Sequence, residues 1–92
     1  MHETGIVRDL VRHLELTALD AGAERVVSAT VWLGALSQFS AEHFREHFNQ
    51  EAKDGIAEGA AVTIEQSDDA NDPHAQDVMI KSIELEVREA ES

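Results

Sequence analysis

The first three residues, Met1, His2 and Glu3, carry the donor atoms that most clearly suggest chemistry. The amine of Met1, the backbone amides of His2 and Glu3, and the His2 imidazole follow one another along the chain. They can close small chelate rings and place four nitrogens in one plane, which suits Ni(II) or Cu(II) and fits tetrahedral Zn(II) badly. Amides bind a metal only after losing their protons, so such a site weakens as the pH falls. The alternative is that these residues are a plain lead-in to the first helix.

A second candidate is the segment HFREH, which places His43 and His47 four residues apart on a predicted helix. This spacing lets two imidazoles meet one ion, and Glu46, Glu51 and His74 are candidates for the remaining ligands. The segment lacks the glutamate that makes an HExxH motif catalytic. Because one helical turn supplies only two of the usual three or four ligands, an exposed helix face is the competing interpretation.

The polar segment SDDANDPHAQD, residues 67–77, gathers four aspartates and a histidine. These groups can attract a hard cation, but they lack the regular alternation and the closing glutamate of an EF-hand loop. We therefore expect a solvated loop. No nucleophile arrangement, phosphate-binding loop or paired-carboxylate site is recognisable elsewhere, so the sequence predicts a binding protein and not an enzyme.

The composition excludes several classes of function. Seven basic and nineteen acidic residues give a net charge of −12, which repels nucleic acid and anionic lipid and attracts cations and basic protein surfaces. The absence of cysteine excludes disulfides, thiolate metal sites and cysteine nucleophiles. No signal peptide or membrane-spanning segment is recognisable, and we expect a cytoplasmic protein.

The elements that must position these residues follow from hydrophobic periodicity. Helical spacing predicts an amphipathic helix over residues 4–21, with Gly22 as its stop. A second helix should begin after Ser40 as its N-cap and end near Gly55, with Phe39 packing on Phe44 as a hydrophobic staple. Alternating and β-branched residues predict strands over residues 24–34, 60–66 and 77–87.

Strict alternation also assigns the strand faces. In the first strand one face receives Val27, Ala29, Val31 and Leu33, and the other receives Val26, Ser28, Thr30 and Trp32. In the last strand Met79, Ile83, Leu85 and Val87 share one face, and Val78 and Ile80 lie on the other.

The order helix, strand, helix, strand, strand predicts an α+β fold, with two helices packed on one face of a three-stranded sheet. The length suits a single domain, residues 1–88, followed by an acidic tail at residues 89–92. A homodimer is also possible, because small sheets expose their edge strands.

Four segments together resemble the HypA/HybF family of nickel-insertion accessory proteins: MHE, VWLGALSQFS, GIAEGAAVTIE and MIKSIELEV. The resemblance implies a nickel metallochaperone for [NiFe] hydrogenase maturation, with Ni(II) bound at Met1, His2 and Glu3. It also implies the hydrogenase maturation GTPase and the hydrogenase large subunit as partners, with urease maturation proteins as a further possibility.

One departure from the family is large. Its members carry a zinc module with two CxxC pairs between the last two strands, whereas this chain has residues 67–77 there and no cysteine. We therefore expect no zinc at a thiolate site, whether the module was lost naturally or by engineering. The loss leaves a second hypothesis open, a metal-independent interaction or regulatory module in a maturation complex that no longer delivers metal.

Overall fold

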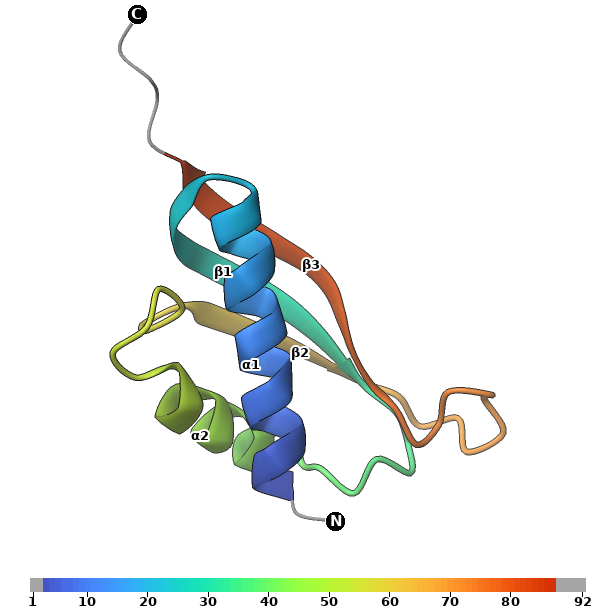
Figure 1. Cartoon of the computed structure of the whole chain (residues 1–92). Helices are drawn as coiled ribbons and strands as arrows, with labels where there is room; N and C mark the ends of the chain where they lie inside the picture. The colour runs from blue at the N-terminus through green and yellow to red at the C-terminus, as the bar shows by residue number, and fades with distance from the viewer. Residues whose placement is uncertain (1–2, 88–92) are drawn as a thin grey trace, which may run out of the picture.

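The computed structural model of the chain describes residues 3–87 and contains the five expected elements in the expected order (Figure 1). Helix α1 spans Glu3–Asp20, strand β1 Ala23–Leu33, helix α2 Ala41–Ala52, strand β2 Ala61–Gln66 and strand β3 Val78–Val87. Both helices lie on the same face of the sheet (Figure 1). The predicted α+β architecture is confirmed.

The sheet has the order β2-β1-β3, so the longest strand lies in the centre. Strand β2 runs parallel to β1, which it joins through α2, and β3 runs antiparallel to β1. Arg45 of α2 donates a hydrogen bond of 2.9 Å from Nη2 to the carbonyl of Val62 in the edge strand β2. This contact ties the second helix to the edge of the sheet.

The core lies between the helices and the sheet. Helix α1 contributes Val7, Val11, Leu14 and Ala18, helix α2 contributes Phe44, Phe48 and Ala52, and β1 contributes Val26, Ala29, Val31 and Leu33, all essentially without solvent exposure. The burial of these side chains holds α1 and α2 against the sheet.

The predicted helix ends are confirmed in part. The Ser40 side chain accepts a hydrogen bond of 3.1 Å from the backbone N–H of His43, and the Phe39 and Phe44 rings meet edge to face at 5.6 Å. Helix α2 ends at Ala52, three residues earlier than expected, and Asp54 adopts a positive φ of 68° that turns the chain away.

The predicted faces of the first strand are wrong at its centre. The pairing of β1 with β3 shifts register between Val26 and Ser28, so Val27 occupies a bulge. Val26 therefore enters the core with 0% exposure, whereas Val27 is only half-buried. Strict alternation had placed Val27 on the same face as Ala29, Val31 and Leu33. In the structure it is Val26 that is buried with these residues.

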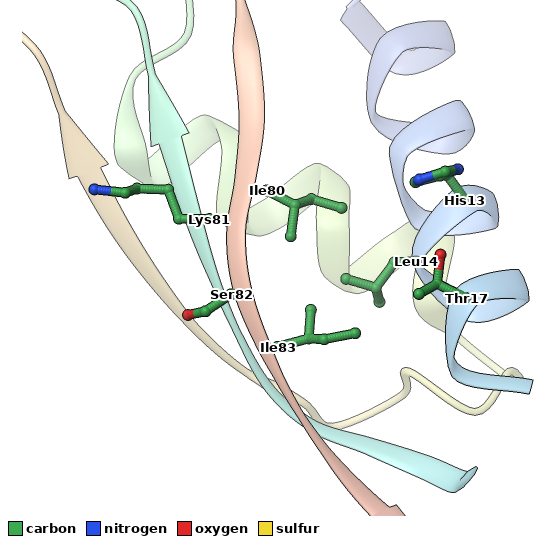
Figure 2. Close-up of a pocket in the computed structure, with 7 residues that line it drawn as sticks. All are labelled: His13, Leu14, Thr17, Ile80, Lys81, Ser82 and Ile83. Carbon is green, nitrogen blue, oxygen red and sulfur yellow. The ribbon is translucent and has the colours of Figure 1, made fainter. Parts of the chain in front are cut away.

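Another of the three register shifts between β1 and β3 overturns the predicted faces of the last strand. The register shifts again where Thr30 pairs with Ser82 and Val31 pairs with Ile80, which leaves Lys81 as the extra residue. Figure 2 shows Ile80 and Ile83 pointing toward α1, with Lys81 and Ser82 on the opposite side. Val78 and Ile80 thus share the inner face with Ile83 and Leu85, while Met79 and Val87 are exposed.

Candidate metal centre

Of the predicted N-terminal ligands, the structure describes only Glu3, the first residue of α1. Met1 and His2 fall outside the described residues, and α1 begins at Glu3. The first four N–H groups of a helix have no acceptor within the helix. The Glu3 amide can therefore lose its proton to a metal ion without breaking a helical hydrogen bond.

The buried face of α1 begins one turn after these residues. Val7 is completely buried and Val11 follows at 2% exposure, so the first turns are held against the core. Between Val7 and Val11, the side chains of Arg8 and Asp9 are exposed, with Arg8 Nε 3.6 Å from Asp9 Oδ1. Helix α1 is thus held in place close to its start.

The structure brings together the two histidines of the second candidate site. The ring centroids of His43 and His47 lie 5.7 Å apart on α2, with an interplanar angle of 65°. His43 is exposed and His47 is half-buried. Within residues 3–87 no group of three or more histidine, aspartate or glutamate side chains is arranged to hold a metal ion. The pair therefore remains a predicted secondary site without a third ligand from this part of the chain.

His74, once a candidate third ligand for this pair, has a local partner instead. Its Nδ1 lies 2.9 Å from Oδ2 of Asp77 within residues 67–77. Its backbone N–H donates to the Asp72 carboxylate at 2.7 Å, and the N–H of Asn71 donates to Asp69 at 3.0 Å. The two bonds from backbone N–H groups to aspartate carboxylates are typical of turns, so Asp69 and Asp72 help to order the segment.

Residues 67–77 are also joined to the connection between β1 and α2, residues 34–40. Gly34 donates its N–H to the carbonyl of Asp77 at 2.9 Å, and Leu36 donates to Ala75 at 2.7 Å. A Cβ on Gly34 would lie 2.6 Å from the carbonyl oxygen of His74 and closer still to the carbonyl of Ala75. Glycine at position 34 is required for this approach of two backbones.

A cleft of about 760 Å³ opens at the same end of the molecule. Its lining residues come from α1, from residues 34–40 and from residues 67–77: Ile6, Ala35, Leu36, Ser37, Gln38 and Gln76. Figure 1 shows the start of α1 beside the connection that leads from β1 to α2. Sequence reasoning missed this cleft, although the apolar Leu36 in a short connection was a signal for it.

The other clefts carry few groups that bind metal. A pocket of about 260 Å³ lies between α1 and β3, with His13 at its rim and Leu14, Ile80 and Ile83 among its lining residues (Figure 2). His13 is exposed, as expected for a residue at the edge of the buried helix face. This groove is apolar and offers no metal site within the part of the chain described here.

Comparison with known proteins decides the family. The model of one family, described as hydrogenase/urease nickel incorporation, metallochaperone, hypA, matches residues 1–72. The chain belongs to the HypA family. Metallochaperones of this family are not enzymes, and their cargo is nickel for hydrogenase and urease. The residues matched include the N-terminal Met-His-Glu segment, and the cysteine-free sequence leaves no thiolate site for zinc.

Solved structures support the same fold at low sequence identity. The solution structure of the Ni metallochaperone HypA from Helicobacter pylori superposes with a TM-score of 0.79 and 16% identity, covering 96% of this chain and all of that chain. A second HypA solution structure gives a TM-score of 0.74 and 15% identity, covering 96% and 98%. No curated protein sequence matches the chain. At these identities the likeness is one of fold.

None of the helices described in residues 3–87 is long and apolar enough to cross a membrane.

Proposed function

We propose that this HypA-family chain binds one Ni(II) ion through the amine of Met1, the amides of His2 and Glu3, and the His2 imidazole, and passes it on during [NiFe] hydrogenase maturation. The observation that carries the proposal is the family match, which begins at residue 1 and describes nickel incorporation. The order of donor atoms along the chain supports planar coordination of Ni(II).

A nickel complex without net charge is compatible with the N-terminal end of α1. The positive end of a helix disfavours an additional cation. Two deprotonated amides cancel the two positive charges of Ni(II), so the four-nitrogen complex is neutral at its core. The start of α1 at Glu3 makes at least one of these amides available without cost to the helix.

Delivery requires that the ion can leave. A chelate formed by the chain end can be opened one ligand at a time, beginning with a terminal group, while α1 stays packed on β1. The same donors bind Cu(II) more tightly than Ni(II), so selectivity has to come from metal supply and from the partner that receives the ion. The maturation GTPase and the hydrogenase large subunit are the proposed partners, and urease maturation proteins are the next candidates.

Titration of the untagged chain with Ni(II), followed by calorimetry and absorption, tests the proposal. We expect one-to-one binding and a yellow, diamagnetic complex. His2→Ala, or one glycine added before Met1, should abolish that complex. The control is His13→Ala, since His13 is exposed on α1.

Two results would change the assignment. If His2→Ala leaves the nickel affinity unaltered and His43→Ala lowers it, the ion binds at the His43 and His47 pair instead. If the wild-type chain binds no nickel and still binds a maturation protein, the metal-independent interaction module is correct. The missing cysteines are the observation that keeps this second function under consideration.

A further inference from the structure

Strand β3 lies at one edge of the sheet, and the outer side of this strand is open. In the order β2-β1-β3 it pairs with β1, and within residues 3–87 no strand pairs with its other side. Its ten residues therefore present a long open edge. Proteins usually shield such an edge with charged side chains, because an exposed edge can pair with a strand of another molecule. The charged side chains of β3 therefore decide whether its edge is available.

All three charged side chains of β3 are directed toward the rest of their own sheet. Lys81 Nζ lies 3.1 Å from Oε1 of Glu65 in β2, so this side chain reaches back across β1. Glu84 accepts a hydrogen bond of 2.6 Å from a serine hydroxyl of β1. Glu86 accepts one of 3.0 Å from an arginine of β1. None of the three shields the open edge.

An apolar groove follows the same strand on the face that carries the helices. Two pockets, of about 260 and 500 Å³, lie between α1 and β3, and both are lined by His13 and Ile80 (Figure 2). Among all their lining residues, Asp9 and Lys81 are the acidic and basic ones, one of each sign. The chain as a whole has a net charge of −12. A second copy therefore meets less electrostatic repulsion along this groove than over the protein surface as a whole.

The apolar side chains of β3 form a pattern that is symmetric about the middle of the strand. Because Lys81 is the extra residue of a bulge, the half-buried inner positions are 78, 80, 83 and 85. Reversed about a point between residues 81 and 82, this set coincides with itself, with 78 opposite 85 and 80 opposite 83. Directly opposite residues of an antiparallel pair lie on the same face of the sheet. A second β3 in this register thus meets apolar residues with apolar residues, and a shift of one residue places outward side chains opposite inward ones.

We propose that the open edge of β3 is a homodimer interface, at which two copies of the chain pair antiparallel about a two-fold axis between residues 81 and 82. The three-stranded sheet then continues from one copy into the other. The groove of each copy receives the inner face of the other copy's β3, so the contact is the same on both sides of the axis.

This dimer keeps the starts of the two α1 helices apart. Asp9 and Val78 line the same pocket, so the first half of α1 lies beside the start of β3. Thr17 and Ile83 line the next pocket, so both elements run in the same direction along the groove. Antiparallel pairing therefore places the two α1 starts toward opposite ends of the shared sheet. The inference goes beyond the proposed function and does not depend on it.

Sedimentation velocity of the untagged chain over a range of concentrations tests the interface. We expect a reversible dimer that salt strengthens, because screening reduces the repulsion between two chains of net charge −12. The register places Met79 of each copy opposite Glu84 of the other. Met79→Glu therefore creates two like-charged pairs and should weaken the dimer about tenfold. Its control is Thr63→Glu, at an exposed position of the other edge strand, β2, which should leave the dimer unchanged.

A charge reversal distinguishes this contact from a general effect of charge. Met79→Glu combined with Glu84→Lys turns the two repulsive pairs into attractive ones and should restore the dimer. Met79→Glu combined with Glu46→Lys has the same net charge, but Glu46 is exposed on α2 and should not restore it.

The absence of cysteine allows the register to be read directly. Met79→Cys mixed with Glu84→Cys under oxidising conditions should give a disulfide between the two variants, because directly opposite Cβ atoms lie about 4.5–5.5 Å apart, close to the separation that a disulfide needs. Met79→Cys mixed with Thr63→Cys should give much less of the mixed disulfide, since Thr63 lies in β2 at the other edge of the sheet.

Each outcome decides for or against the interface. Met79 is 37% exposed, so an unchanged unfolding midpoint, measured where the wild type is monomeric, shows that Met79→Glu folds. A chain that stays monomeric overturns the proposal, whether or not another protein binds this edge. So does a dimer that Met79→Glu does not weaken or that cross-links equally well through position 63.

The two proposals fail separately. Met79→Glu should bind Ni(II) as the wild type does, and His2→Ala should lose Ni(II) and still dimerise. A dimer that binds no nickel would overturn the proposed function and keep the interface.

Discussion

Gly34→Ala is the sharpest test of how the end of the molecule at which α1 begins is built. The added Cβ meets backbone atoms, the carbonyls of Ala75 and His74, and a backbone cannot rotate away as a long side chain can. Overpacking of this kind costs about 1–3 kcal/mol. Separating residues 34–40 from residues 67–77 also breaks the two backbone hydrogen bonds donated by Gly34 and Leu36, at about 1 kcal/mol each. The expected loss is about 3–5 kcal/mol.

A loss of this size is a large part of the stability of a 92-residue domain. At about 4–8 °C per kcal/mol, the unfolding midpoint should fall by at least ~12 °C, as measured by circular dichroism or calorimetry. Hydrogen exchange adds a local readout, since the Leu36 amide should lose its protection. The matched control is Gly5→Ala in the first turn of α1, where a Cβ meets nothing within 4 Å. It should raise the midpoint slightly, because alanine favours the helix. If Gly34→Ala unfolds at the wild-type temperature, residues 67–77 do not pack on Gly34.

Four further predictions follow from the fold and the proposed site. In urea denaturation, Val26→Ala should lower the free energy of unfolding by about 2 kcal/mol, because Val26 is fully buried. Val27→Ala should lower it by less than about 1 kcal/mol, and equal losses would contradict the bulge at Val27. Ser40→Ala should cost about 1 kcal/mol through the lost N-cap, and Ser40→Thr should restore most of it. Removal of metal ions with EDTA should leave the unfolding midpoint unchanged, because side chain–backbone bonds order residues 67–77; a lower midpoint would indicate a structural metal. Calorimetry should show the nickel affinity falling at least ~100-fold for each unit that the pH is lowered, since two amide protons are displaced, and a pH-independent affinity would exclude amide ligation.

Local signals in the sequence were sufficient for the order of the elements and for several of their ends, although not for the end of α2. The Ser40 cap, the Phe39 and Phe44 staple and the Gly22 stop depend on neighbouring residues, and each lies where it was predicted. The resemblance of the chain to the HypA family also proved correct.

The bulges were missed because strict alternation was assumed. In the last strand the half-buried residues fall at positions 78, 80, 83 and 85, with one spacing of three residues where alternation requires two. Two consecutive polar residues, Lys81 and Ser82, fill the wider spacing. That pattern is a bulge signal, since one inserted residue restores both isoleucines to the core.

The cleft depends on contacts that no local pattern contains. Gly34 and Ala75 are 41 residues apart in sequence, and their approach follows from the antiparallel pairing of β1 with β3, which returns the chain to the end of β1. The glycine was correctly placed at the end of the strand. Its closeness to a second backbone becomes visible only once the strand order is known.

The same pairing explains how the chain can lack a cysteine-bound zinc module and still keep residues 34–40 and 67–77 in order. The pairing of β1 with β3 brings the residues before β3 next to the connection between β1 and α2. The bonds from Gly34 to Asp77 and from Leu36 to Ala75 then join these two segments with backbone atoms alone. Asp69 and Asp72 then fold the intervening residues by binding the amides two positions ahead. Metal is therefore not needed to close this part of the fold.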